Sequence, residues 1–241
     1  MSKKSLVGKC AAALGLTVLI AGMAIASGGH SGVPESADEA LQKLMDGNKR
    51  YVENQMTSGK QSGAAARAAL ANSQKPYAII LSCSDSRVPP EIIFDKGLGE
   101  LFIVRVAGNI PDPIILGSIE YAAEHIGTPL IMVLGHERCG AVTATVNAKG
   151  KPEGNIGEIV KVITPAVKAA TKDCDACKGV KNCKETKNAD FVECSANANM
   201  KMVAANLTKK SKVLKHLVEQ GKVKIVSAKY DLDDGVVTLF K

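Results

Sequence analysis

Two short clusters in the chain carry side chains that bind metal ions. The first is the segment CSDSR, which begins at Cys83, and the second is the segment HERCG, which begins at His136. Together they offer two thiols, an imidazole and a carboxylate, which belong to Cys83, Cys139, His136 and Asp85. Thiolate and imidazole ligands favour a tetrahedral zinc ion. We therefore expect a Zn2+ site, provided that the fold brings the two clusters together.

Each cluster follows a short apolar run, at residues 77–81 and 130–134. Runs of this length between polar or turn-forming residues are typical of buried strands. In an open parallel sheet, binding sites form at the carboxyl ends of the strands. Alternate residues of an extended segment face the same way, so Cys83, Asp85 and Arg87 can share a face. If the two strands are neighbours, the two clusters meet at one edge of the sheet.

The rest of the chain alternates expected strands with expected helices. Further strands are expected at residues 101–106, 223–230 and 236–240, the last returning antiparallel after a tight turn at 233–235. Helices are expected from residue 37, after a capping box of Ser36 and Glu39, and at residues 64–71, 116–126, 140–146, 156–170 and 199–220, with a break or kink near Pro165. This alternation predicts an α/β fold: a mostly parallel central sheet of four strands plus an antiparallel edge strand, flanked by helices.

The first residues have the features of an export signal. Three lysines precede an apolar run at residues 11–25, which ends in the small-x-small pattern of a cleavage site. We expect residues 1–26 to be a signal peptide, residues 27–35 a flexible lead, and residues 36–241 a single domain. The mature chain is then expected to be periplasmic or secreted, with no attachment to a membrane. An uncleaved N-terminal anchor is the alternative, although the run is short for a membrane span of about 20 residues.

Composition gives little support for binding to nucleic acid. The formal net charge of +7 falls to +4 without residues 1–26, which contain three lysines and no acidic residue. No basic stretch is interleaved with aromatic side chains, so nucleic acid is not an expected partner. Aromatic residues make up 3% of the chain and tryptophan is absent, so aliphatic side chains must fill the core.

A polar, lysine-rich segment at residues 172–195 holds four of the seven cysteines, which are Cys174, Cys177, Cys183 and Cys194. In an oxidising compartment two disulfides are favoured, and their pairing does not follow from the sequence. A structural zinc site with four cysteine ligands is the alternative, because Cys-x2-Cys is a common half of such sites. We interpret the segment as an insertion that forms a polar loop with little core of its own.

The two metal-type clusters together resemble the beta-class carbonic anhydrases. The resemblance rests on Cys-Ser-Asp-Ser-Arg-Val from Cys83 and on Gly-His-x-x-Cys-Gly from Gly135. It covers about residues 36–146, returns weakly in the last two strands, and points to an exported bacterial type with a plant-like active site. The cysteine-rich insertion departs from the family pattern. The resemblance implies a homodimeric α/β enzyme with one Zn2+ per chain, held by Cys83, His136 and Cys139, that hydrates CO2 to bicarbonate and a proton.

Asp85 has two possible roles under this resemblance. It can fill the fourth position on the zinc and close the site, or it can pair with Arg87 and leave that position open for water. A bidentate arginine–carboxylate pair fixes orientation well, and we favour this second arrangement. Asp85 would then orient zinc-bound hydroxide toward CO2, while Arg87 holds Asp85 away from the metal.

The resemblance also implies a substrate pocket. Gln74 resembles a glutamine that hydrogen-bonds the substrate oxygen, and Phe102 and Tyr121 resemble two aromatic residues of the pocket. In the family these residues come from the facing subunit or the dimer seam, so the site would need a homodimer or a higher homo-oligomer. Gly108, after the second strand, is a candidate for the pocket wall, and a simple turn is the alternative.

Two other functions fit the same residues. The first is a hydrolase of the same fold that acts on carbonyl sulfide or carbon disulfide, because access to the pocket does not follow from the sequence. The second is a non-enzymatic protein with a closed, structural zinc site. The presence of Asp85 with Arg87, together with Gln74, argues for the enzyme, because a structural site has no use for an orienting arginine.

Overall fold

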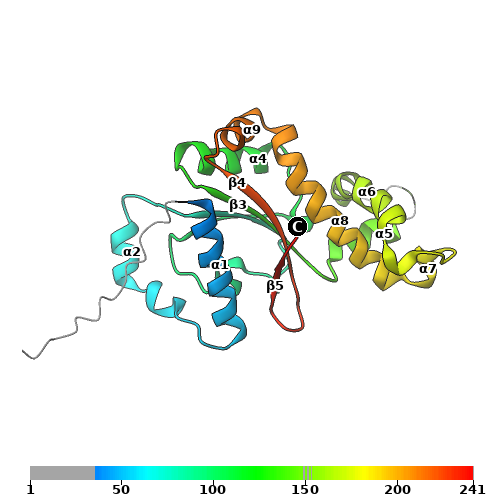
Figure 1. The fold of residues 1–241 in the computed structure, drawn as a ribbon, viewed down its shortest axis with the longest axis horizontal. Helices are drawn as coiled ribbons and strands as arrows, with labels where there is room; N and C mark the ends of the chain where they lie inside the picture. Colours follow the sequence, from blue (N-terminus) through cyan, green and yellow to red (C-terminus); the bar gives the residue numbers. More distant parts are fainter. Residues whose placement is uncertain (1–35, 149, 151, 153, 241) are drawn as a thin grey trace, which may run out of the picture. The chain divides into compact units, whose positions relative to one another are not determined.

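The computed structural model describes residues 36–148, 150, 152 and 154–240. The expected signal peptide and lead lie outside these residues. At the centre is a five-stranded sheet, whose strands are β1 (Ala78–Ser82), β2 (Leu101–Arg105), β3 (Leu130–His136), β4 (Lys224–Tyr230) and β5 (Val237–Leu239). Their order is β2-β1-β3-β4-β5; β1 to β4 pair in parallel, and β5 is antiparallel to β4 (Figure 1). The predicted mostly parallel sheet with an antiparallel edge strand is confirmed.

Helices connect the strands and flank the sheet (Figure 1). The longer ones are α1 (Ala37–Val52), α4 (Pro113–Glu120), α5 (Gly140–Asn147), α6 (Ile156–Asp173), α8 (Asn188–Lys210) and α9 (Lys212–Glu219). The shorter segments are α2 (Ala64–Leu70), α3 (Pro90–Ile93), α7 (Cys183–Thr186), the 3-10 turns η1 (Ser58–Gln61), η2 (Ala107–Asn109) and η4 (Asp175–Cys177), and the π-helical η3 (Tyr121–His125). Among the described residues, no helix is long and apolar enough to cross a membrane.

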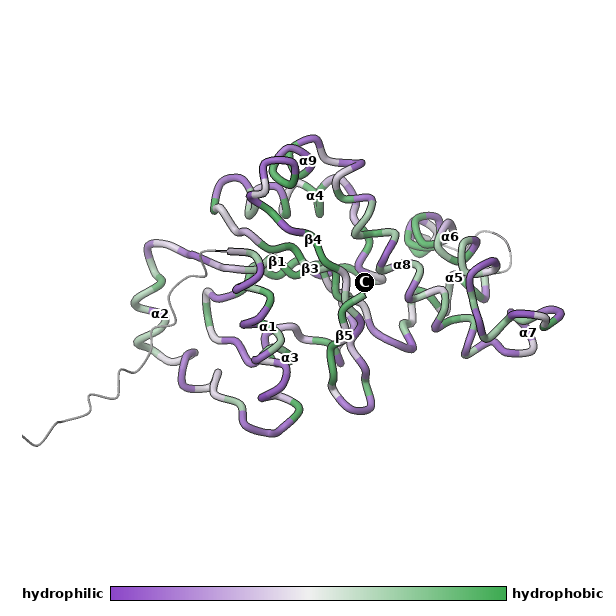
Figure 2. Tube along the Cα trace, viewed as in Figure 1, coloured by the Kyte–Doolittle hydropathy of each residue, from purple (hydrophilic) through white to green (hydrophobic). Residues whose placement is uncertain are grey.

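Alternate side chains of the strands enter two hydrophobic clusters, one on each face of the sheet. Ile80 and Met132 belong to the cluster that α1, α5 and α6 cover, whereas Ile79 and Ile131 belong to the cluster that α4 and α9 cover. Figure 2 shows this apolar centre between more polar helices. The alternation is the period of two expected of strands. Because helices cover both faces, every residue of β1 and β3 is buried.

The helices α6 and α4 differ from their predicted course in one respect each. α6 runs through Pro165 without a break, because Ile163 and Ala166 pack in the core, and this burial outweighs the one backbone hydrogen bond that a proline removes. α4 begins at Pro113, earlier than predicted, where Asp112 caps it by accepting the N–H of Ile115 at 2.8 Å. The capping box predicted for the start of α1 is confirmed.

The helix expected at residues 199–220 is two helices, α8 and α9, and α8 starts well before residue 199. The break falls at Ser211, whose Oγ accepts the N–H of Leu214 at 3.0 Å and donates to Glu120 Oε1 at 2.5 Å. Ser211 therefore caps α9 and ties it to α4. A serine cap inside an apolar pattern was the overlooked signal.

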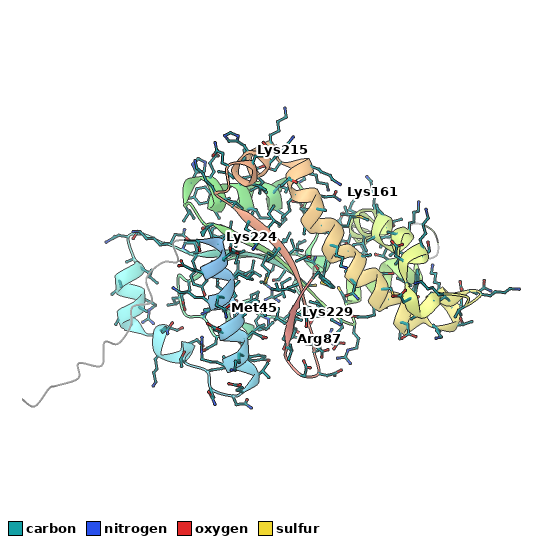
Figure 3. The ribbon with its side chains drawn as sticks, viewed as in Figure 1. Met45, Arg87, Lys161, Lys215, Lys224 and Lys229 are labelled. Atoms are coloured by element: carbon teal, nitrogen blue, oxygen red, sulfur yellow. A yellow bond between two sulfur atoms is a disulfide. The ribbon has the colours of Figure 1, made fainter. Side chains whose placement is uncertain are left out.

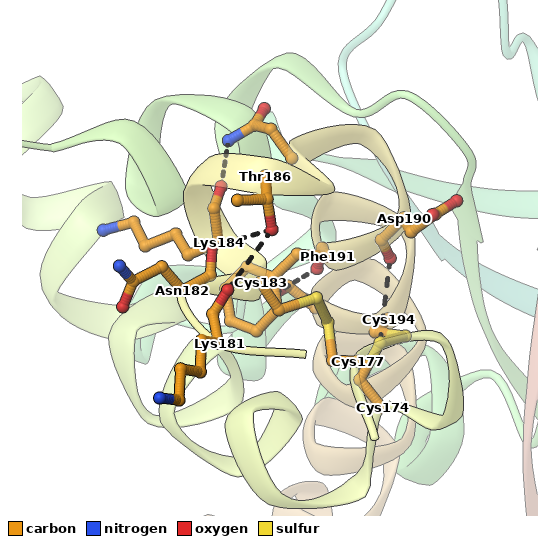
Figure 4. The surroundings of a disulfide bond; sticks show 12 residues. Cys174, Cys177, Lys181, Asn182, Cys183, Lys184, Thr186, Asp190, Phe191 and Cys194 are labelled. Carbon is orange, nitrogen blue, oxygen red and sulfur yellow. Dashed lines mark hydrogen bonds between the residues drawn. A yellow bond between two sulfur atoms is a disulfide. The ribbon is translucent and has the colours of Figure 1, made fainter. Parts of the chain in front are cut away.

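The cysteine-rich segment contains two disulfides, as favoured from the sequence, but it is not a polar loop. The bonds join Cys174 to Cys194 and Cys177 to Cys183 (Figure 4). The first of them links the end of α6 to α8. Phe191, on α8, is 2% exposed and packs in the main core cluster. The expectation that this segment has little core is therefore wrong for its second half, which α8 carries into the core.

Candidate active site

The carboxyl ends of β1 and β3 bring the two metal-type clusters together. The strands pair with Ser82 opposite Leu134, so Cys83 leaves β1 beside the end of β3, where His136 is the last residue. Cys139 directly precedes α5. The ligand atoms of Cys83, His136 and Cys139 lie within 4.8 Å of one another, and each residue is at most 4% exposed. The three residues thus form one buried group, the cysteine–histidine group.

His136 presents one ring nitrogen to this group. Its Nδ1 lies 2.8 Å from the carbonyl oxygen of Glu137, where it donates as an N–H, so that Nε2 carries the lone pair. Nε2 is buried and has no hydrogen-bond partner among the described residues. A buried polar atom without a partner is costly. A metal ion would satisfy it, and one imidazole with two thiolates is a donor set that fits Zn2+.

The turn between His136 and Cys139 is held against the hairpin that follows β4. Arg138 has a φ of +51°, which is unusual for a residue other than glycine. Its Nη2 donates to Glu137 Oε1 at 2.6 Å and to Asp233 Oδ1 at 2.9 Å. These contacts stabilise the turn that directs Cys139 back toward the group.

Asp85 is engaged by Arg87 rather than by the cysteine–histidine group (Arg87 is labelled in Figure 3). Arg87 Nε donates to Oδ1 at 2.9 Å, and Nη2 donates to Oδ2 at 2.8 Å. These bonds hold the pKa of Asp85 well below its ordinary value, although partial burial acts in the opposite direction. Asp85 is therefore charged near neutral pH, with Oδ2 3.8 Å from Nε2 of His136. The structure thus contains the bidentate Asp85–Arg87 pair on which the favoured arrangement depends.

The two thiols of the group influence each other. The hydrogen bond with Cys139 lowers the pKa of Cys83; burial opposes this, and the hydrogen bond from the backbone N–H of Gly108 lowers the pKa further. The same thiol hydrogen bond and burial raise the pKa of Cys139. Cys83 is therefore the thiolate of the pair, and Cys139 is its proton donor. Binding of a divalent cation would release that proton.

Arg105 belongs to the site, and the sequence analysis missed it. It is the last residue of β2, opposite Ser82 of β1. Its Nε donates to the carbonyl oxygen of Cys83 at 2.9 Å, and its Nη2 donates to that of Asp85 at 2.6 Å. Arg105 thereby fixes the backbone that carries both residues. A charged residue at the carboxyl end of an apolar strand was the signal that could have found it.

Gly108, predicted as pocket wall or turn, contacts the group directly. Its backbone N–H donates to Cys83 Sγ at 3.3 Å. Its φ is +72°, in the left-handed region that favours glycine. A Cβ at this position would lie 2.7 Å from Ile163 Cδ1 and 3.2 Å from Ala141 Cβ. Both the backbone conformation and the close approach of α5 and α6 therefore require glycine.

The other residues expected in the pocket lie away from the group of their own chain. Gln74 is exposed and precedes β1, whereas the cysteine–histidine group lies beyond the other end of this strand. At the usual rise per residue, the strand separates Gln74 from the group by more than about 15 Å. Phe102 lies near the start of β2, and its ring centroid is 6.5 Å from that of Tyr121, which is 51% exposed. Any role for these three residues in a pocket needs a second copy of the chain.

Fold and site together define an α/β protein with a buried cysteine–histidine group at the carboxyl edge of a parallel sheet. A family model described as carbonic anhydrase matches residues 78–237. Over 203 residues the chain is 38% identical to carbonic anhydrase 2 of Mycobacterium tuberculosis, which covers 83% of this chain and 91% of that protein. The chain belongs to the carbonic anhydrase family, whose reaction is the hydration of CO2.

Further comparisons agree with this assignment. A carbonic anhydrase of Mycolicibacterium smegmatis is 47% identical over 131 residues, which is 53% of this chain and 63% of that protein. The solved beta-carbonic anhydrase CcaA has a TM-score of 0.65 at 22% identity, over 83% of this chain and 95% of its own. For CafA of Aspergillus fumigatus, the TM-score is 0.64 at 24% identity, over 85% and 90% of the two chains. The fold is therefore that of the solved beta-carbonic anhydrases, and the family assignment makes the protein a carbonic anhydrase enzyme.

Proposed function

We propose that the enzyme hydrates CO2 with a zinc ion held by Cys83, His136 and Cys139, and with Asp85 and Arg87 as an orienting pair. One observation carries this proposal: the unpaired Nε2 of His136 lies beside two thiol sulfurs, while Arg87 engages the neighbouring carboxylate of Asp85. Three protein ligands leave one tetrahedral position for water, which is the arrangement of catalytic rather than structural zinc sites.

The residues around this position account for the reaction. Zinc bound there supplies a Lewis acid that lowers the pKa of a coordinated water toward neutrality. Asp85 accepts a hydrogen bond from the attacking O–H and so directs an oxygen lone pair at the carbon of CO2. The proton of the coordinated water would pass to solvent before the attack; as the new C–O bond forms, one C=O electron pair moves onto its oxygen, which gives bicarbonate. Arg87 holds both carboxylate oxygens, so Asp85 keeps this orientation.

Stopped-flow CO2 hydration, with zinc counted per chain, tests the proposal. Asp85→Asn and Arg87→Ala should each keep one zinc per chain and slow hydration by about 100-fold, because the orienting acceptor or its support is lost. Arg67→Ala, on the exposed surface of α2, is the matched control and should leave the rate unchanged. Full zinc occupancy without CO2 hydration would reject the proposal. Carbonyl sulfide and carbon disulfide would then be assayed as substrates. If neither were hydrolysed, the remaining hypothesis would be a non-enzymatic protein with a structural zinc site.

A homodimer or larger homo-oligomer is part of the proposal. β2 forms one edge of the sheet, where Tyr121 packs near Phe102. On α4, which contacts β2, Ile114 is 80% exposed. Open apolar edges of this kind are usually covered in native proteins. A fungal structure from Sordaria macrospora with a TM-score of 0.63 is described as one of two tetrameric beta-carbonic anhydrases. Light scattering should give at least twice the chain mass, and Ile114→Lys should shift the enzyme toward monomer and slow CO2 hydration.

Export to the periplasm or medium is also proposed. The two disulfides support it, because disulfides persist in oxidising compartments. Mass spectrometry of the enzyme recovered from the periplasmic fraction and from the medium should find a chain that begins at Ser27. An intact N-terminus in the membrane fraction would instead support an uncleaved anchor.

A further inference from the structure

One side chain far from the two sequence clusters reaches the metal site through the backbone. Asn199 lies on α8 and is 3% exposed. Its Nδ2 donates to the carbonyl oxygen of Gly108 at 2.9 Å, across 91 positions of sequence. Gly108 belongs to η2, the turn that follows β2. A buried amide side chain thus spans from a helix to the turn beside the metal ligands.

The same glycine holds the metal ligand on its other side. The N–H of Gly108 donates to Cys83 Sγ, so its two backbone groups bond to Asn199 and to Cys83. Gly108 has no side chain to anchor it, and glycine has the widest backbone freedom of all residues. The contacts of α5 and α6 restrict where it lies, but they form no hydrogen bond that sets the direction of its N–H. The bond from Asn199 fixes the peptide plane that follows Gly108 and so limits the rotations about Gly108 that would turn its N–H away from Cys83.

We propose that Asn199 is a positioning residue of the metal site, because it orients Gly108 so that the glycine N–H donates to the sulfur of Cys83. This inference rests on the proposed zinc site. Asn199 touches neither substrate nor metal, and it acts only through Gly108. Hydrogen bonds to a ligating sulfur fix the ligand's orientation and tune its charge, and such outer contacts typically matter by about 10- to 100-fold in metal affinity.

α8 is itself fixed relative to both halves of the ligand set. Met200, next to Asn199, packs against Gly135 so closely that no Cβ fits at this glycine. Gly135 directly precedes His136. The disulfide between Cys174 and Cys194 ties the same helix to the end of α6. α8 runs beside α6 and across β3 and β4 in Figure 1. Asn199 therefore donates from a rigid support rather than from a flexible segment.

Asn48 offers a matched control within the same protein. It is also a buried asparagine, 4% exposed, and its Nδ2 donates to the carbonyl oxygens of Ile93 at 3.2 Å and Gly235 at 2.8 Å. Among the described residues, neither acceptor hydrogen-bonds to Cys83, His136 or Cys139, in contrast to Gly108. Replacing Asn48 removes at least as many buried hydrogen bonds as replacing Asn199. The Asn48 variants therefore measure how a loss of stability by itself changes zinc affinity.

The experiment compares the full chain with Asn199→Ala, Asn199→Asp, Asn48→Ala and Asn48→Asp. The aspartate variants keep the shape of the side chain and remove its N–H donor. Their zinc affinity can therefore be measured even if an alanine variant does not fold. Zinc affinity is measured by competition with a chelator, and the thiolate-to-metal charge-transfer band is measured after cobalt substitution. Melting temperature is recorded for all variants. We expect about 10-fold weaker zinc binding and a shifted cobalt band for both Asn199 variants, and wild-type values for both Asn48 variants despite lower melting temperatures.

Wild-type zinc affinity and an unshifted cobalt band in Asn199→Asp would overturn the role of Asn199. Equal losses in the Asn48 and Asn199 variants would also overturn it, because the effect would then follow from stability. A wild-type chain that binds no zinc would instead overturn the proposed zinc site, whatever the variants do.

Discussion

Two regions of the molecule use cysteine in opposite ways. At the carboxyl edge of the sheet, Cys83 and Cys139 are free thiols that share a buried group with His136. In the segment that runs from the end of α6 into α8, four cysteines form two disulfides (Figure 4). The sheet edge is a candidate metal centre, and the second region is a covalent link between helices.

The difference lies in the support that each region provides. β1 and β3 are paired along their length, so the positions of Cys83 and His136 follow from strand register and need no covalent link. The first half of the insertion consists of short pieces, η4 and the four-residue α7, which belong to no strand of the sheet. There the disulfides supply the constraint themselves, by restricting the unfolded chain. The rigid sheet edge can therefore keep its thiols free to bind a metal. The insertion has less support of its own, and its thiols form disulfides that stabilise it.

The largest expected effect tests the sheet edge. Cys139→Ser and Cys83→Ser should each weaken zinc binding by more than about 100-fold, because losing a ligand costs more than losing an outer contact. CO2 hydration should fall to background in both variants. The double variant Cys174→Ser with Cys194→Ser should keep one zinc per chain. Zinc analysis after dialysis against a weak chelator checks this, and zinc loss in the disulfide variant would remove the distinction between the regions.

A smaller effect tests the insertion. Removing the Cys174–Cys194 bond should lower the free energy of unfolding by about 3 kcal/mol, and removing Cys177–Cys183 should lower it by about 2 kcal/mol. The first effect is larger because that bond closes a longer stretch, with a sequence separation of 20 against 6. Urea unfolding of the two serine double variants measures both values. The reverse order would show that loop length does not set the stabilisation.

An effect as small as that of the Cys177–Cys183 bond comes from Asp95, which lies in neither region. Burial alone would raise its pKa, but the Arg50 guanidinium and the backbone N–H groups of Ser58 and Thr57 outweigh burial and lower the pKa to about 2, from 3.8. Because the folded pKa is depressed, this stabilisation is fully present above about pH 4 and is lost as the pH falls toward 2. Asp95→Asn should remove about 2 kcal/mol at pH 7 and flatten the acid dependence of unfolding. The disulfide variants should keep the wild-type dependence, and an unchanged slope in Asp95→Asn would refute the assignment.

Local patterns in the sequence were enough to predict much of the fold. The apolar runs around β1 and β3 marked buried strands, and the polar clusters after them marked the edge at which the site lies. The capping box at Ser36 predicted the start of α1. These features depend on residues close together in the chain, where periodicity and turn chemistry act directly. The ligand types at Cys83, His136 and Cys139 could be named for the same reason.

Other features depended on contacts between distant segments. The sequence could not pair Cys174 with Cys194, because four cysteines allow three pairings and only the packing of α6 against α8 selects one. Nor could it show that Asn199 reaches Gly108 across 91 positions. The chain by itself determined which residue types stand at the strand ends. Strand order, helix packing and burial decided which of them meet, because these interactions join residues whose separation in sequence carries no local signal.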